Sequence, residues 1–439
     1  MATQPLKSRH IRPKQAAWAA AGVIAALILA AVITGPGAWA AVGARGAEVL
    51  RGLLGDQAVA GLETTVFTFQ DNLHQLEFHA GSQPAAPWTT AAGGPANAWS
   101  PLTLTTPAES TPWASAADLA TPNPGATPPA SPGASGAPET PGWTLSPVPD
   151  AGSLRGAGRW LPYIHDGSGQ VVAYRTFVQP DPQRPYTVVA MAAFDLKAVK
   201  LHFVLGSQEP KSTVAIDRPG TIPASDFTAG TVLAAFNGGF KAQHGHFGVI
   251  VDGVTVIPPR PGLGTIAISA NGQVSIGAWG TDITAAPNAL AYRQNGPLLI
   301  HNGQINPLTA DNSPQDWGYT VGGRTASWRS GLGVSADGRT LYYVAGPSLT
   351  LPALATSLAR AGAAQAVQLD INDYWVHFDT FQTVNGNVQP MPLVDSMQLQ
   401  DDQRYIRGFI RDFFYVTADM PAATRPSAPN SGRLDRGGQ

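Results

Sequence analysis

A long stretch with no periodic apolar face divides this chain and limits what it can fold into. Residues 80–150 are mostly Ala, Pro, Thr, Ser and Gly with almost no charge, and prolines are closely spaced from Pro122 to Pro141. Such a composition buries too little apolar surface to offset the entropy lost on ordering the backbone. We therefore expect a disordered, partly extended linker at 80–150, with folded structure on either side of it.

The N-terminal side begins with a basic segment followed by an apolar one. Residues 16–34 are nearly all apolar and uncharged, which is roughly the ~20 residues needed to cross a bilayer. The four basic residues before them are Lys7, Arg9, Arg12 and Lys14. Positive flanks stay in the cytoplasm. The pattern predicts a cytoplasmic N-terminus at 1–15, a transmembrane signal-anchor helix at 16–36, and a single-pass cell-membrane protein whose C-terminal domain is extracytoplasmic.

A cleaved signal peptide is the alternative interpretation of the same segment. Ala38-Trp39-Ala40 resembles a signal-peptidase site. The apolar stretch is long for a signal peptide, and apolar residues recur at helical spacing beyond it, so we favour the anchor. Residues 47–79 are predicted to form an amphipathic juxtamembrane helix. This helix would support a dimer, but no sustained heptad proves one, and the oligomeric state stays open.

Composition excludes several classes of function. The chain has no cysteine, so disulfides, thiolate metal sites and a cysteine nucleophile are ruled out. The formal net charge is -2, which provides no strong positive field. We therefore expect no nucleic-acid partner.

The C-terminal side carries one folded domain, at 155–419, followed by a disordered tail at 420–439. Its β-branched and aromatic runs, bounded by turn residues, predict strands at 171–178, 186–194, 199–205, 231–236, 247–251, 265–269, 332–334, 341–345 and 413–416. Pairs such as Asp252-Gly253 and Asp337-Gly338 predict hairpins between such runs. The expected class is α+β, with mainly antiparallel or mixed sheets and few helices.

One helix is predicted clearly, at Leu351–Ala361. Thr350 suits the N-cap, Pro352 the first turn and Gly362 the position after the last turn. A short apolar strand follows at 366–369 and ends in Asp370. A carboxylate at the end of a buried strand is often part of a site.

Asn237, Gly238 and Gly239 form the first candidate constellation, directly after an apolar strand. Two glycines there allow backbone N–H groups to approach an anion closely. The alternative is an ordinary glycine turn.

The second constellation is Arg324-Thr325, with Arg329 nearby. A guanidinium suits bidentate binding of phosphate. The alternative is a pair of surface arginines on a hairpin.

The third constellation is a dense polar cluster in apolar surroundings, made of Asp370, Asn372, Asp373, Trp375 and His377. It could contain a general acid or base, an aromatic platform for a sugar, or oxygen ligands for a cation. The alternative is a turn capped by Asp and Asn side chains.

His244-Gly245-His246 is a fourth, weaker motif. Two histidines flanking one residue can bind a metal, but no third ligand lies nearby in the sequence. We therefore assign no metal ligand. The chain also has no phosphate-binding Walker motif, no nucleophile elbow and no zinc-protease motif.

The order of the motifs is more specific than any one of them. Asn237–Phe240 is followed by 248–253, by Arg324-Thr325, by 331–334 and by the segment 349–370. This order resembles the phosphodiester glycosidase family over about Val232 to Asp370. The resemblance implies hydrolysis of a sugar-1-phosphodiester to free sugar and a phosphomonoester, here on a cell-surface glycan or phosphoglycan of the envelope.

Together with the constellations, the resemblance suggests roles for the site residues. Asp370 would act as acid or base or hold the sugar, and we expect Asp370 and Asp373 to be the catalytic residues. Substrate would be bound by the remaining residues of the constellations: Asn237, Gly238, Gly239, Arg324, Thr325, Asn372, Trp375 and His377. No cofactor is implied, although a divalent cation held by Asp370, Asn372 and Asp373 is a third option.

Two departures mark this chain as a divergent subfamily. The family's Leu-Asp-Gly-Gly-Gly-Ser motif keeps only Leu369-Asp370 here, because Ile371-Asn372-Asp373-Tyr374 replaces the glycine run. Lys241 also stands where a second aromatic residue is common. The rival hypothesis is therefore a non-catalytic glycan-binding or envelope-scaffolding protein on the same fold.

Overall fold

The computed structural model describes residues 55–88, 143–286, 289–311, 317, 324–384, 387–397 and 403–419. The predicted basic N-terminus, the membrane helix at 16–36, most of the linker and the tail at 420–439 lie outside these residues. Within the described ranges, no helix has both the length and the apolar character needed to cross a membrane.

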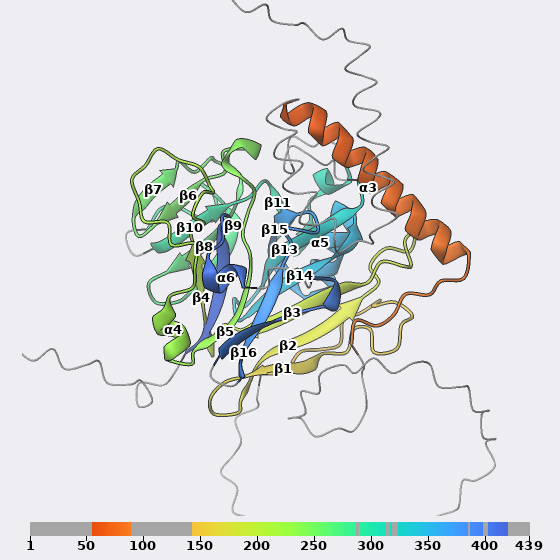
Figure 1. The fold of residues 1–439 in the computed structure, drawn as a ribbon, viewed down its shortest axis with the longest axis horizontal. Helices are drawn as coiled ribbons and strands as arrows, with labels where there is room; N and C mark the ends of the chain where they lie inside the picture. Colours follow the sequence, from red (N-terminus) through yellow and green to blue (C-terminus); the bar gives the residue numbers. More distant parts are fainter. Residues whose placement is uncertain are drawn as a thin grey trace, which may run out of the picture. The chain divides into compact units, whose positions relative to one another are not determined.

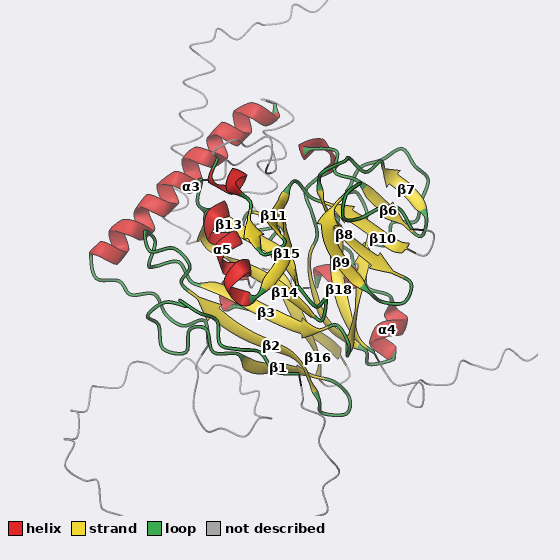
Figure 2. Ribbon diagram, turned by 180° about the vertical axis from the view of Figure 1, so that it is seen from behind, coloured by secondary structure: helices red, strands yellow, loops and turns green. Residues whose placement is uncertain are grey.

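The domain contains three sheets whose strands pair antiparallel (Figures 1 and 2). The largest sheet has the strand order β1-β2-β3-β14-β13-β15-β11-β12. In this order, the strands lie at Leu161–His165, Val171–Val178, Val189–Asp195, Thr340–Leu349, Ser327–Ser335, Ala363–Ile371, Leu298–His301 and Gln304–Ile305. The second has the order β7-β6-β10-β8-β9, at Val254–Ile257, Val249–Val251, Ala289–Gln294, Gly264–Ser269 and Val274–Ala278. The third has the order β17-β16-β5-β18-β4, at Asn387–Pro392, Phe378–Val384, Val232–Asn237, Phe413–Ala418 and Val199–Val204.

Helices are few among the described residues. The α-helices are α3 at Asp56–His79, α4 at Ala224–Thr228, α5 at Leu351–Ala361 and α6 at Arg404–Arg407. Short 3-10 turns lie at Ala242–His244, Pro307–Ala310 and Asp395–Met397. The prediction of mainly antiparallel sheets with few helices is confirmed.

Helix α5 forms where its capping signals predict it. The Thr350 hydroxyl accepts a hydrogen bond from the Ala353 amide at 3.3 Å, and Gly362 ends the helix with φ 105°. The helix carries the chain from β14 over β13 to β15. A Cβ on Gly331 of β13 would lie 2.9 Å from the Leu358 side chain, so this glycine allows the helix to pack closely on the sheet.

The ends of β5, β15 and β18 meet beside the main core. Phe236, Phe378 and Phe414, from three adjacent strands, are fully buried and their rings stack. The Asp370 amide donates to the Gly238 carbonyl at 2.9 Å, which ties the end of β15 to the segment after β5. This junction places the chemically interesting residues together.

Helix α3 lies along the outside of the domain near α5, and its described contacts are specific (Figure 1). Asp71 pairs with Arg184 at 2.9 Å and accepts a hydrogen bond from the Tyr186 hydroxyl at 2.7 Å. Phe67 packs against the cluster of Phe240, Phe247 and Ile371, which adjoins the junction. The helix falls within the stretch 47–79 for which helical structure was predicted.

Candidate functional site

Three segments that are distant in sequence converge at the junction. They are Gly238-Gly239 after β5, Asp370 near the end of β15, and Arg411-Asp412 before β18. The Gly238 amide donates to the Asp412 carbonyl at 3.1 Å, and a terminal nitrogen of Arg411 donates to the Gly239 carbonyl at 3.0 Å. One backbone bond and one side-chain bond therefore hold Arg411-Asp412 against the two glycines.

Asp370 is the central carboxylate of this site. Only 5% of the residue is exposed, and its carboxylate pairs with the guanidinium of Arg411. Burial raises the pKa of Asp370 to about 6, although Arg411 and a bond from the Ile371 amide oppose the rise. Asp370 therefore titrates close to neutral pH, as suits a group that moves protons.

Arg411 connects several parts of the site. Its guanidinium carbon lies 4.7 Å from the centre of the Trp375 ring, a cation–π arrangement. Within the described structure, its Nε is buried and has no hydrogen-bond partner. One donor of this guanidinium is thus unused by the protein.

Lys241 brings a second cation to the same ring. Its Nζ lies 5.7 Å from the centre of Trp375, and 5% of the residue is exposed. Burial lowers the pKa of Lys241 to about 8, and the charge of Arg411 lowers it further in the same direction, while Asp370 opposes both. With Lys241 and Arg411 beside it, Trp375 does not present the open platform for a sugar that the sequence suggested.

Gly238 and Gly239 are needed here for close packing, and their amides are not free to bind an anion. The Gly239 amide donates to the Asp412 carboxylate at 3.2 Å, and the Gly238 amide is also engaged within the protein. A Cβ on Gly239 would lie 2.7 Å from the guanidinium carbon of Arg293. The expectation that these amides cradle a phosphodiester therefore does not fit this structure, because both donors are already occupied.

A second buried ion pair, between Arg293 and Asp412, adjoins the first. Arg293 Nε donates to the Asp412 carboxylate at 2.8 Å, and both side chains are buried. Arg293 also donates to the Phe240 carbonyl at 2.7 Å. Further bonds of this kind satisfy a buried charge pair that would otherwise be costly to desolvate.

Asn237 and His377 lie beneath the site and are buried. The Asn237 side-chain oxygen accepts from the Tyr343 hydroxyl at 2.9 Å and from the His377 amide at 3.2 Å, and its nitrogen donates to Ser330 at 2.9 Å. The His377 ring pairs with Asp379 at 2.9 Å. Their contacts join β5 to β13, to β14 and to the start of β16, so the structure gives both residues a positioning role.

Asn372 and Asp373 belong to a turn after β15. Asn372 has φ 78°, and its carbonyl accepts from the amides of Trp375 and Val376. Asp373 is half-buried, and burial raises its pKa. A turn is therefore present, as the alternative for this cluster expected, but the Asn372 side-chain oxygen does not cap it, because within the described structure this oxygen is buried without a hydrogen-bond partner.

Arg324 and Thr325 occupy a different setting. Arg324 is exposed, and its Nε donates to the Ala310 carbonyl at 3.0 Å. Thr325 is buried, and its carbonyl accepts from Arg329 at 3.0 Å. The guanidinium that pairs with Asp370 is that of Arg411.

Sequence reasoning missed Arg411, Asp412 and Arg293, and treated Lys241 only as a departure from the family. The sequence held a signal for two of them, because Arg411-Asp412 directly precedes the apolar strand β18, just as Asp370 lies at the end of β15.

The described His, Asp and Glu side chains form no group of three or more that could hold a metal ion.

This β-rich domain buries a carboxylate beside two cations. Such a site can combine acid–base chemistry with anion binding. Residues 230–370 match the family model of the phosphodiester glycosidases. The match confirms the resemblance inferred from the order of the motifs. It ends at Asp370, so Arg411 lies beyond it.

Solved structures similar to this chain include the catalytic domain of zebrafish N-acetylglucosamine-1-phosphodiester α-N-acetylglucosaminidase, auto-inhibited by its pro-peptide. It shares 16% identity, with a TM-score of 0.38, over 60% of this chain and 88% of that one. A hypothetical protein from Synechocystis shares 13% identity, with a TM-score of 0.31, over 56% and 62% of the two chains. A protein from Burkholderia pseudomallei shares 12% identity, with a TM-score of 0.28, over 52% and 74% of the two chains. A search of curated proteins found no match.

Proposed function

We propose that this domain hydrolyses sugar-1-phosphodiesters, with Asp370, Arg411 and Lys241 as its chemical centre. One observation carries the proposal: a buried carboxylate whose pKa is about 6 pairs with one cation and lies close to a second. The family match over residues 230–370 supports the same reaction class.

Arg411 and Lys241 are suited to hold the phosphodiester. Both are cations beside one tryptophan ring, and a phosphodiester carries one negative charge that they can share. The unused Nε of Arg411 gives the substrate a donor that no protein group occupies. In this scheme Arg411 exchanges its bond to Asp370 for one to the phosphate.

Asp370 then acts on water. Its carboxylate takes a proton from the water that attacks the anomeric carbon, and the bond from that carbon to the phosphate oxygen breaks. The products are the free sugar and a phosphomonoester, whose leaving oxygen is stabilised by Arg411 and Lys241. A phosphate is a good leaving group, so the scheme needs no strong acid opposite Asp370.

The substrate has to displace side chains to reach this centre. Asp370, Arg411 and Lys241 are buried, and Phe67 of α3 packs against Phe240 and Ile371, which adjoin them. We therefore expect entry to require movement at this edge of the domain, as in enzymes whose sites close over the reaction.

The test is turnover by the full chain on a panel of sugar-1-phosphodiesters, with release of reducing sugar as the readout. Asp370→Asn is the active-site variant, and Asp379→Asn, beneath the site, controls for general damage to the buried network. We expect turnover by the wild type, a loss of at least 100-fold in Asp370→Asn, and a folded protein by circular dichroism. Equal turnover by Asp370→Asn would refute the assignment.

A non-catalytic glycan-binding role is the second candidate. The observation that favours it is the pairing of Asp370 with Arg411 in a buried cluster, because this pair leaves the carboxylate already compensated. Saturable binding of a phosphoglycan without release of any reducing sugar would favour this role over hydrolysis.

We further propose that the protein acts at the cell membrane on envelope glycans, anchored through residues 16–36. The proposal rests on the apolar segment and its basic flank in the sequence. Protease added to intact cells should digest the C-terminal domain and leave an N-terminal fragment in the membrane. Complete recovery of the protein in the soluble fraction would exclude the anchor.

A further inference from the structure

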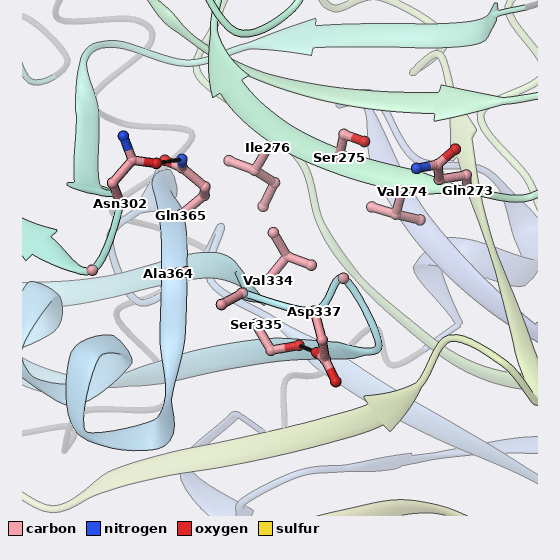
Figure 3. A pocket seen from close by; sticks show the side chains of 13 residues that line it. Gln273, Val274, Ser275, Ile276, Asn302, Val334, Ser335, Asp337, Ala364 and Gln365 are labelled. Atoms are coloured by element: carbon pink, nitrogen blue, oxygen red, sulfur yellow. Dashed lines mark hydrogen bonds between the residues drawn. The ribbon is translucent and has the colours of Figure 1, made fainter.

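A groove whose lining mixes polar and apolar side chains lies at the opposite end of β15 from Asp370. Its volume is about 590 Å³, within the roughly 300–1,000 Å³ typical of ligand sites. Four segments distant in sequence line it: the start of β9, the β11–β12 turn, the β13–β14 turn and the start of β15 (Figure 3). Gln365 and Asp370 are five residues apart on β15, which separates the groove from the site by about 17 Å at ~3.3 Å per residue.

The lining specifies the chemistry of a ligand. The polar side chains of the lining end in carboxamides, hydroxyls and one carboxylate. They belong to Gln273, Ser275, Asn302, Ser335, Asp337 and Gln365. Among the described residues that line the groove, none carries a positive charge or an aromatic ring. Amides and hydroxyls both donate and accept hydrogen bonds, as the hydroxyl groups of a sugar do.

The carboxylate of Asp337 disfavours anionic ligands. Its Oδ1 accepts from the Ser335 hydroxyl at 2.5 Å and from the Arg339 amide at 3.1 Å, and these bonds lower the pKa of Asp337. Asp337 is the one charged residue among the described lining residues, and the charge of Arg339, outside the lining, also lowers its pKa. The lining therefore offers an anionic ligand no positively charged partner, in contrast to the cationic centre at Arg411.

Part of the groove is held in place before any ligand binds. Gln365 Nε2 donates to Asn302 Oδ1 at 2.8 Å, which fixes both amides (Figure 3). Within the described structure, the Gln365 side-chain oxygen is buried without a hydrogen-bond partner, so a small rotation of this side chain would be needed to present it to a ligand hydroxyl. Asn302 itself lies in a tight turn, with φ 50°, followed by Gly303 with φ 77°.

We propose that this groove binds a neutral oligosaccharide segment, independently of the chemistry at Asp370. Such a site would hold a glycan chain on the domain while another part of it reaches the buried centre. The proposal does not depend on hydrolysis, because the groove shares no residue with that centre.

The test measures binding of neutral hexasaccharides of glucose, mannose and galactose to the immobilised full chain by surface plasmon resonance, in a detergent without a sugar headgroup. Hexagalacturonate is the anionic comparator. The groove variant is Gln273→Leu/Gln365→Leu, which preserves side-chain volume. The matched control is Gln389→Leu, an exposed glutamine on β17.

We expect at least one neutral hexasaccharide to bind more tightly than hexagalacturonate. The groove variant should bind it at least tenfold more weakly, while Gln389→Leu should bind it as the wild type does. Unchanged melting temperatures show that the variants are folded. Absence of binding by all three neutral sugars, equal binding by the groove variant, or preference for hexagalacturonate would overturn the proposal.

Discussion

Arg411 pairs with Asp370 across 41 residues of sequence, and both side chains are buried. The pair joins the end of β15 to the segment before β18. Two opposing effects act on the pKa of Asp370: burial raises it, and the positive charge of Arg411 lowers it.

Replacing Arg411 should destabilise the fold strongly. Arg411→Met leaves the Asp370 carboxylate buried without its cation, which typically costs about 3–5 kcal/mol. Urea unfolding at pH 7 measures this loss, with Arg407→Met, at the exposed last residue of α6, as the control. The loss should shrink at pH 5, where Asp370 can take up a proton instead. A variant as stable as the wild type at pH 7 would show that the pair does not compensate the buried charge.

Asp370 should make stability depend on pH in a defined direction. Its pKa rises from 3.8 to about 6 on folding, so between these values the folded state binds more protons than the unfolded state. The stabilising contribution is then fully present below about pH 4 and is lost as pH rises through about 6, by up to about 3 kcal/mol. Asp370→Asn should lack this dependence. Unfolding free energies of the two proteins at pH 4, 5, 6 and 7 give the comparison, and parallel curves would contradict the assigned pKa.

Activity should have a bell-shaped pH profile. Asp370 must lose its proton to accept one from water, so kcat/KM should rise through pH about 6. Lys241 must keep its charge to hold the phosphate, so kcat/KM should fall above pH about 8. Lys241→Arg should move the upper limb to higher pH and leave the lower limb in place. An upper limb that does not respond to this change would exclude Lys241 from the phosphate site.

A side chain at position 239 should destabilise the fold. A Cβ there would lie 2.7 Å from the guanidinium carbon of Arg293, whose pair with Asp412 would have to shift. We expect Gly239→Ala to lower the free energy of unfolding by about 1–3 kcal/mol. Gly167→Ala is the matched control, because no atom lies within 4 Å of its added Cβ. Equal melting temperatures for the two variants would disprove this packing role.

Sequence patterns predicted the parts of the fold that depend on local physics. Helix α5 was predicted at Leu351–Ala361 and lies there, because capping by Thr350, the glycine at 362 and the leucine stripe all act within one turn or two. Strand β2 likewise has the predicted bounds, Val171–Val178. Glycine turns such as Asp337-Gly338 also specify their own geometry.

The site was only partly predictable, since its central contact is not local. Asp370 was identified from its position at the end of a strand. Its partner Arg411 lies in another segment, and no pattern near Asp370 indicates which arginine reaches it. Arg324 was the arginine expected at the site, but it is exposed beside Ala310. Lys241 was noted in the sequence, but its role depends on the position of Trp375, which only the fold reveals.

Hydrolysis of a p-nitrophenyl sugar-1-phosphodiester in water enriched in oxygen-18 tests the central claim most directly. Water attack at the anomeric carbon releases unlabelled p-nitrophenyl phosphate, whereas attack at phosphorus places the label in the phosphate. We predict unlabelled p-nitrophenyl phosphate for the full chain, with turnover lost in Asp370→Asn. Label in the phosphate, or turnover that survives Asp370→Asn, would contradict a glycosidase centred on Asp370.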